Sequence, residues 1–315
     1  MIFFPSIHLN PKLMRTKYII FALMLVCSTL YSQQDAQYTN YMYNTINVNP
    51  AYAGSRGVTS VFGLYRTQWV GMDGAPVTSS FSVNSPIGSN LGGGLSFVND
   101  RIGPTVSNTI SADISYTIHT SETYQLALGV KASGNLFNLD ATALNPKHQD
   151  DPSLQNLDNQ FTPNVGAGVY FYSDKLYVGL SAPSIFTTTR YSDDDIAVYE
   201  ARVTAYFIGG YVFDLNRNLK FKPTFVSKLV KGAPAQLDVS ANFLFNDKFT
   251  IGAAWRWDAA ASIMAGFQIS DGLMIGYSYD LETTELNNYN SGSHEIFLRF
   301  EFVKHLERVL SPRFF

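Results

Sequence analysis

Apolar and polar residues alternate between Gly57 and Phe302, in segments of about ten residues that turn residues separate. The alternation is most regular over 235–257, where a turn at 246–248 divides two such segments. A period of two places one set of side chains on each face of a β-strand. One soluble core cannot easily use so many long strands with aromatic residues at their ends, and a lipid-facing band explains them better. The pattern therefore predicts an all-β fold, an antiparallel transmembrane β-barrel.

The alternation divides into fourteen expected strands. They are 57–67, 76–84, 91–99, 105–119, 123–138, 163–173, 175–185, 199–213, 218–230, 234–246, 248–258, 259–270, 272–284 and 291–303. An even number brings both ends of a single-chain barrel to the periplasmic side of the outer membrane. The long connections 138–162, 185–199 and 282–291 all follow odd-numbered strands, and the connections after even-numbered strands are short. This asymmetry predicts short periplasmic turns and long cell-surface loops.

Composition argues against a helical membrane protein. The mean hydropathy is −0.02 and 15% of the residues are charged, while 19 Tyr and 23 Phe make the chain rich in aromatic residues. A transmembrane helix needs about 20 apolar residues, and the only apolar run, Tyr18 to Leu30, is shorter than that. Because Arg15 and Lys17 precede this run, we expect residues 1–32 to be a secretory signal peptide whose true start is Met14.

Three regions follow the expected signal peptide. They are an N-terminal periplasmic or plug segment at 33–56, an outer-membrane β-barrel at 57–303 and a C-terminal tail at 304–315. The only cysteine, Cys27, lies in the signal peptide, so the mature chain needs neither disulfide nor thiol chemistry. Val26 before it is not the small residue that a lipoprotein signal requires.

The charge of the mature chain does not suggest nucleic acid. Of the 22 basic residues, Lys12, Arg15 and Lys17 precede the cleavage site, so the mature chain has 19 basic and 25 acidic residues and a net charge of −6. Nucleic-acid-binding domains are usually basic. No nucleic-acid partner is expected.

The polar face of the barrel is expected to enclose charges of both signs. The inward charged positions include Lys220, Lys222, Asp238, Arg256, Asp280, Arg299 and Glu301. A lumen of mixed charge is more typical of ion pairs across the barrel, with water, than of an ion-selective path. We therefore expect these charges to be structural.

Motifs for catalysis or metal binding are missing from the sequence. It contains no Walker A loop, no HExxH and no G-x-S-x-G, and no two histidines of the mature chain share metal-ligand spacing. Gly92-Gly93-Gly94 lies within a strand pattern, where glycine indicates a bend or close packing rather than a phosphate site. The acidic stretches at 150–151 and 193–195 lack the spacing of a calcium loop. We expect no enzyme activity, no cofactor and no metal.

The segment before the barrel is rich in tyrosine. Its members are Tyr38, Tyr41, Tyr43 and Tyr52. Asn49-Pro50 favours an extended or turn conformation, and Gly54 allows a sharp turn towards the first strand. Such a segment would bury well in the barrel lumen as a plug, the favoured interpretation, and the alternative is an arm that docks other proteins in the periplasm.

Three residues follow at the outer end of the first strand. Arg66 is expected to pair with an acidic residue of the lumen, beside Gln68. Trp69 is expected to anchor the barrel at the membrane interface.

Several motifs resemble one known family. They are Gln37-Tyr38-Thr39-Asn40-Tyr41-Met42-Tyr43-Asn44, Asn49 to Gly57, Tyr65 to Gly71, Gly74-Ala75-Pro76 and Gly292 to Ile296. Together they resemble the PorP/SprF family of Bacteroidetes, outer-membrane proteins of the type IX secretion system and of gliding motility. The resemblance covers nearly the whole mature chain, but the tail after Phe302 runs beyond the usual end of the family.

The resemblance implies a non-enzymatic component that supports export or surface anchoring of secreted proteins. It implies three kinds of partner: outer-membrane lipids, type IX components on the periplasmic side, and a secreted cargo protein with a C-terminal sorting domain on the surface side. A folded cargo cannot pass through a fourteen-stranded lumen filled with side chains, which favours docking or anchoring. The alternative is a passive porin or small-solute transporter, which leaves the N-terminal motifs unexplained.

The long loops 138–162 and 185–198 are expected to offer apolar residues to the cargo at the cell surface. These residues are Leu139, Leu144, Leu154, Leu157 and Phe161 in the first loop, and Ile185, Phe186, Tyr191 and Ile196 in the second. The other interpretation is that the loops simply fold over the mouth of the barrel.

Overall fold

A computed structural model describes residues 36–144, 156–191, 197–201 and 203–302. The expected signal peptide and C-terminal tail lie outside these residues. The strands are β1 (Ser60–Thr67), β2 (Val77–Pro86), β3 (Leu91–Ile102), β4 (Thr105–His119), β5 (Gln125–Leu139), β6 (Leu157–Tyr172), β7 (Leu176–Ser184), β8 (Thr188–Tyr191), β9 (Ala197–Ala201), β10 (Thr204–Tyr211), β11 (Phe213–Asn216), β12 (Leu219–Val230), β13 (Gln236–Phe245), β14 (Phe249–Arg256), β15 (Ala260–Ser270), β16 (Leu273–Glu282) and β17 (Ser293–Glu301).

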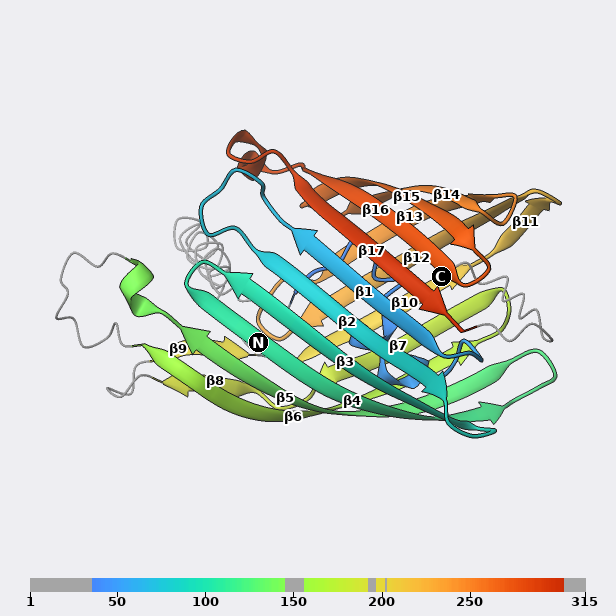
Figure 1. Cartoon of the computed structure of the whole chain (residues 1–315), viewed down its shortest axis with the longest axis horizontal. Helices are drawn as coiled ribbons and strands as arrows, with labels where there is room; N and C mark the ends of the chain where they lie inside the picture. The colour runs from blue at the N-terminus through green and yellow to red at the C-terminus, as the bar shows by residue number, and fades with distance from the viewer. Residues whose placement is uncertain (1–35, 145–155, 192–196, 202, 303–315) are drawn as a thin grey trace, which may run out of the picture.

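Fourteen of these strands close into one antiparallel barrel (Figure 1). Each barrel strand pairs with its neighbours along the chain, β1 pairs with β17, and β10 pairs with both β7 and β12, so that no edge is left open. β11 is a four-residue extension that pairs only with β12. Because the barrel is closed, the backbone N–H and C=O groups of its strands can all form hydrogen bonds within the sheet, which a strand in lipid requires. The predicted fold and strand number are confirmed.

The two faces of the strands also match the alternation. On β16, Met274, Ser278 and Asp280 are buried, whereas Tyr277 is exposed on the outside. On β4, Ile110 is 60% exposed and Ser111, the next residue, is buried. The outer surface is thus apolar and aromatic and the lumen polar, as a barrel in lipid requires.

Tight turns join the strands at one end of the barrel. Asn246 and Asp247 have φ angles of 51° and 53° and connect β13 to β14. Asparagine and aspartate tolerate this left-handed conformation, which lets a short hairpin turn follow the twist of the strands. The longer connections, 140–156 and 283–292, lie at the other end. By the rule for outer-membrane barrels, the long-loop end faces the cell surface.

Two expected boundaries are wrong. β6 begins at Leu157 rather than at 163, so it runs well beyond the predicted strand. The predicted strand 199–213 is divided: its first residues belong to β9, which pairs with β8 in a separate two-stranded hairpin, and the barrel strand β10 begins at Thr204. Alternation cannot distinguish a barrel strand from a hairpin that continues beyond the barrel.

The long loops expose fewer apolar residues than expected. Leu139 and Leu157 are buried with Phe137 in a small cluster where β5 meets β6. Phe161 is exposed but belongs to β6, and Ile185 and Phe186 are exposed beyond β7. Leu154 and Ile196 lie outside the described residues, and nothing is described of the side chains of Leu144 and Tyr191.

Helices are short throughout the described residues. They are α2 (Thr45–Val48) and the 3₁₀ turns η2 (Pro50–Tyr52), η3 (Ala141–Leu144) and η4 (Glu285–Asn288). None of the helices in this part of the chain is long and apolar enough to span a membrane. α2 and η2 belong to residues 36–56, which we call the lumen segment because its contacts, described next, are with the inner wall of the barrel.

Candidate functional site: the lumen segment and the barrel wall

The Asn-Pro motif both shapes the lumen segment and attaches it to the wall. The side-chain oxygen of Asn49 accepts a hydrogen bond from the backbone N–H of Ala51 at 3.0 Å, and Pro50 occupies the first position of η2. Both features stabilise a helical turn at its start. The Asn49 side-chain amide also donates to the carbonyl of Val169 on β6 at 3.0 Å. One residue thus forms the turn and fixes its place in the barrel.

The lumen segment runs from the long-loop end of the barrel to the short-turn end. Near its start, Gln37 donates to Gln236, the first residue of β13, at 2.9 Å. At its other end, Arg56 forms an ion pair with Glu301, the last residue of β17. Figure 1 shows this blue stretch within the barrel. The chain therefore passes through the lumen towards the short-turn end. It then returns towards the long-loop end as β1, which is part of the barrel wall.

Inward-facing glycines make room for the segment. A methyl group built on Gly92 of β3 would overlap the carbonyl of Ala53, and one on Gly129 of β5 would overlap the backbone of Ala51. On β6, a methyl group on Gly168 would overlap the Asn49 side chain. Glycine in a strand interior often marks such a close approach of another backbone. The expectation of close packing at Gly92 is therefore confirmed.

Hydroxyl groups of the wall bind the backbone of the segment. Ser115 of β4 donates to the carbonyl of Ala53 at 2.6 Å. Ser181 of β7 donates to the carbonyl of Val48, also at 2.6 Å. These bonds satisfy backbone groups that burial has removed from water, where an unmade hydrogen bond would be costly.

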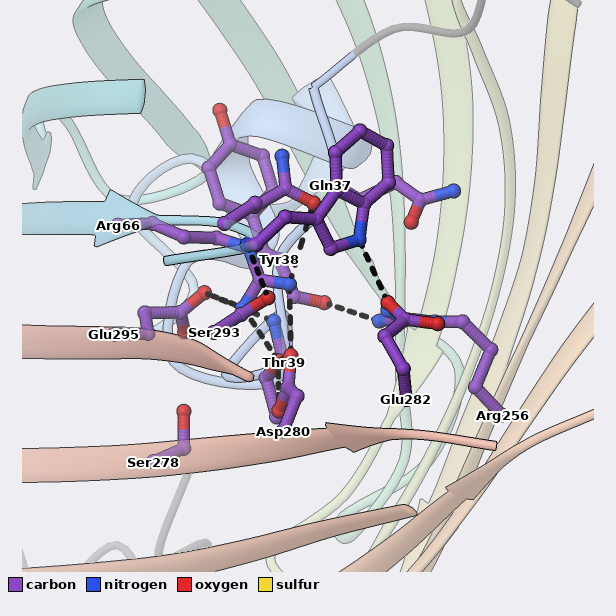
Figure 2. A network of polar contacts seen from close by, with 12 residues as sticks. Gln37, Tyr38, Thr39, Arg66, Arg256, Ser278, Asp280, Glu282, Ser293 and Glu295 are labelled. Carbon is purple, nitrogen blue, oxygen red and sulfur yellow. Dashed lines mark hydrogen bonds and ion pairs between the residues drawn. The ribbon is translucent and has the colours of Figure 1, made fainter. Parts of the chain in front are cut away.

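A network of charged and polar groups holds the start of the segment (Figure 2). Arg66 of β1 pairs with Asp280 of β16 at 2.7 Å and with Glu295 of β17 at 3.3 Å. The Thr39 hydroxyl donates to Asp280 at 2.6 Å and accepts from Arg66 at 2.8 Å. Glu295 accepts the backbone N–H of Asn40 at 2.8 Å. The expected pairing of Arg66 with a luminal acid is confirmed.

The tyrosines of the segment pack among the luminal side chains. Tyr43 stacks on Phe297 with ring centroids 4.6 Å apart, and the cations of Lys222 and Arg299 lie 5.4 Å and 5.6 Å from its ring centre. Cations over an aromatic face are attracted by its negative potential. Tyr43 thus gives two buried positive charges of the wall a favourable contact.

Two further tyrosines contact other parts of the wall. The Tyr41 hydroxyl hydrogen-bonds that of Thr224 at 2.8 Å. Tyr52 lies edge-on to Tyr170 with centroids 5.7 Å apart. All three rings thus contact residues far away in the sequence.

The other luminal charges pair mainly between neighbouring strands rather than across the barrel. Asp238 and Arg256 are register partners on β13 and β14 and form an ion pair at 2.8 Å. Asp113 and Lys131, register partners on β4 and β5, lie 3.1 Å apart. Adjacent strands bring side chains of the same face within contact distance. The expectation of pairs across the lumen is wrong for these residues.

Three predicted positions lie near the short-turn end. Arg299 and Glu301, both on β17, lie 3.5 Å apart. Lys220 pairs with Asp247 of the β13–β14 turn at 2.6 Å, so it occupies the rim rather than the centre of the lumen. Sequence reasoning did not identify Thr39 and Glu295 as members of a network, although both belong to the motifs that carry the family resemblance.

Trp69 faces the lumen rather than the membrane interface. Its indole N–H donates to Glu282 at 2.8 Å. Its φ of 47° is the reason, because this left-handed conformation turns the side chain away from the outward face where β1 ends. The prediction of an interface anchor is therefore corrected.

Above the lumen segment, at the long-loop end, lies a cavity of about 710 Å³. Ala36, Gln37, Tyr38, Asn47 and Val48 of the segment line it together with the barrel wall. This volume is within the range of small-ligand sites, which is about 300–1,000 Å³. We call this space the vestibule. The described residues hold no group of three His, Cys, Asp or Glu side chains that could bind a metal.

A closed barrel of fourteen antiparallel strands, with an apolar aromatic outer face and a polar lumen, defines the chain as an outer-membrane protein. Residues 30–300 match the family model of the type IX secretion system membrane protein PorP/SprF. The chain belongs to this family. No curated protein matches the chain in sequence.

Solved barrels of similar shape have very different sequences. The outer membrane protein Omp33 of Acinetobacter baumannii has a TM-score of 0.47 at 10% identity, with 78% of this chain and 98% of that one covered. The toluene transporter TbuX of Ralstonia pickettii has a TM-score of 0.49 at 11% identity, with 84% and 93% covered. The toluene transporter TodX of P. putida has a TM-score of 0.47 at 9% identity, with 83% and 95% covered.

Proposed function

We propose that the barrel is a docking or anchoring component of type IX secretion, which holds secreted proteins at the cell surface and does not conduct them. Membership of the PorP/SprF family supports the assignment to type IX secretion. The lumen segment argues against conduction, because its buried residues contact strands on all sides of the barrel, from Ser80 of β2 through Ser181 of β7 to Thr224 of β12.

The observation that carries this proposal is the contrast between the two halves of the lumen. The lumen segment begins beside the vestibule and occupies the lumen from there to the short-turn end, with Met42, Ile46 and Ala51 almost fully buried. The long-loop half contains the vestibule. A partner that arrives from the long-loop side therefore finds a recess closed at its base, which suits holding better than passage.

Partners of three kinds fit this role. Lipid contacts the apolar outer face, other type IX components would contact the short-turn end, and a secreted protein with a C-terminal sorting domain would contact the long-loop end. No role for a catalytic group is proposed, because each luminal charge identified above is committed to an ion pair or to a contact with the lumen segment.

The test is removal of the chain from its native cells, combined with purification of the tagged chain from native outer membranes. We expect secreted proteins with a C-terminal sorting domain to appear in the medium instead of at the surface, and the same proteins to copurify with the tagged chain. If all of them stay at the surface and uptake of a small solute falls instead, the barrel is a passive porin and the proposal is wrong.

A further inference from the structure

The wall strands that hold the lumen segment also form the wall of the vestibule. On β4, Ser115 binds the carbonyl of Ala53, and the inward positions beyond it, Ser111, Thr109 and Ser107, line the vestibule. On β5, Lys131 donates to the carbonyl of Ile46 at 3.3 Å. The next inward residues of β5, Ser133 and Asn135, line the vestibule. The same polar surface thus continues from an occupied half of the lumen into the vestibule.

We propose that the vestibule binds an extended end of a secreted polypeptide, which enters from the long-loop side. The proposal rests on the proposed function and specifies the part of the partner that is held. Hydroxyl and amide side chains both donate and accept hydrogen bonds, as a peptide backbone requires. In this barrel, wall hydroxyls already bind backbone carbonyls of the chain's own segment.

The charges of the vestibule argue against a strongly ionic ligand. Lys131 is paired with Asp113 and Arg256 with Asp238. Asp100 accepts from the Thr78 hydroxyl at 2.6 Å, and Glu282 accepts the indole N–H of Trp69 at 2.8 Å. The ligand is therefore held through neutral hydrogen bonds and through the rings that line the vestibule, Tyr38, Trp69, Phe137, Phe186 and Tyr206, rather than by a net charge.

The dimensions and the closed base of the vestibule define the kind of chain that fits. The inward row from Thr105 to Ser111 covers six residue steps, or about 20 Å at the rise of a β-strand. An extended stretch of about six residues matches that length. The lumen segment forms the base, so the bound chain cannot continue to the short-turn end. A free chain end meets both conditions.

The first experiment is photo-crosslinking in whole native cells. A cysteine replaces Thr109 in a Cys27→Ser background, where no other cysteine is present, and carries a benzophenone probe. Thr109 lines the vestibule, whereas the adjacent Ile110 faces outward and provides the matched control. We expect Thr109→Cys to yield an adduct with a terminal peptide of a secreted protein, and Ile110→Cys to yield none.

The second experiment fills the vestibule. Thr109→Trp places a large ring in it, and Ile110→Trp places the same ring in the lipid-facing band. Both variants should assemble into the outer membrane, as measured by heat-modifiable mobility. We expect Thr109→Trp to retain roughly tenfold less secreted partner at the surface, because the added ring excludes the chain end, and Ile110→Trp to retain as much as the parent.

The outcomes separate this inference from the proposed function. If secreted proteins copurify and depend on the barrel, yet Thr109→Cys yields no terminal peptide and Thr109→Trp retains them normally, the vestibule inference is wrong and the anchoring function stands. An adduct with a saccharide, or with the chain's own residues before Ala36, also overturns the inference. If removal of the whole chain leaves surface retention unchanged, the proposed function itself fails.

Discussion

Arg66 and Asp280 lie 2.7 Å apart on β1 and β16, with β17 between those two strands, and both bind the same hydroxyl group of the lumen segment. That hydroxyl belongs to Thr39. Both charged side chains are almost fully buried. A charge removed from water is stable only when it is paired and hydrogen-bonded. The network therefore couples the position of the lumen segment to the closure of the barrel between its first and last strands.

Arg66→Ala should strongly destabilise the barrel. It leaves Asp280 and Glu295 buried without their common cation, and breaking such a buried pair costs about 3–5 kcal/mol. Urea unfolding of the refolded protein in lipid vesicles measures the change. Lys175→Ala is the control, since it removes a pair with Asp214 in which both side chains are about half exposed, and it should change little. Equal loss in both variants would contradict a stabilising role for the network.

Gly129→Ala should displace the lumen segment. The new methyl group overlaps the backbone of Ala51, and forcing extra volume into a packed interior typically costs about 1–3 kcal/mol. Limited proteolysis of the assembled barrel should then cut the segment faster. Gly63→Ala is the matched control, because nothing lies within 4 Å of its added methyl group. If both variants resist protease like the parent, the segment tolerates the overlap and its fit against β5 is loose.

Deleting residues 33–52 should open the barrel. These residues include most of the lumen segment, whose side chains are buried in the lumen that the barrel wall encloses. Single-channel recording in planar bilayers should show higher conductance for the deletion than for the full chain. Deletion of 304–315 provides a control for truncation itself. A full-length chain that already conducts like an open porin would refute the plug and favour the transporter.

The lipid face should reject charge. Ile110→Arg places a guanidinium on the outward face of β4, which should cost about 2–4 kcal/mol if the position lies near the middle of the membrane. Thr109→Arg places the same group in the vestibule, where water and polar neighbours surround it. Folding free energies in vesicles should differ by that amount. Similar values for the two variants would mean that the faces are assigned wrongly.

The strands could be predicted from the sequence because the environment on each side of the wall differs completely. Lipid outside and polar groups inside impose a period of two, and Ile110 and Ser111 follow it as readily as Tyr277 and Ser278 do. The alternation also continues where the chain leaves the barrel, and for that reason the β8–β9 hairpin was not anticipated. The period of the alternation tells which face of a strand a residue occupies, but it does not tell which strand pairs with which.

The candidate site could be predicted only in part. The tyrosines and Asn49-Pro50 indicated a segment that would bury, and Gly92 indicated close packing. The contacts themselves join residues far apart in the chain, such as Thr39 and Asp280, which are separated by 241 positions. No local pattern encodes such a pairing. Trp69 was misplaced because its direction depends on one left-handed backbone angle beyond the end of β1.

The direction of the lumen segment leads to a labelling experiment. The segment begins at the vestibule, where Ala36 is part of the lining, and descends towards Ser55, which is buried near the short-turn end. If the long loops face outwards, a cysteine at Ala36 should react with a membrane-impermeant maleimide on intact cells, although Ala36 precedes the whole barrel in sequence.

Ser55→Cys is the matched control for that experiment. Its side chain is enclosed at the opposite end of the segment, so it should remain unlabelled on intact cells. The expected result is rapid labelling of Ala36→Cys and little labelling of Ser55→Cys, both in the Cys27→Ser background and both at parental levels of assembly. Labelling of Ala36→Cys only after the outer membrane is disrupted would mean that the vestibule does not open to the cell surface, and the anchoring model would lose its binding recess.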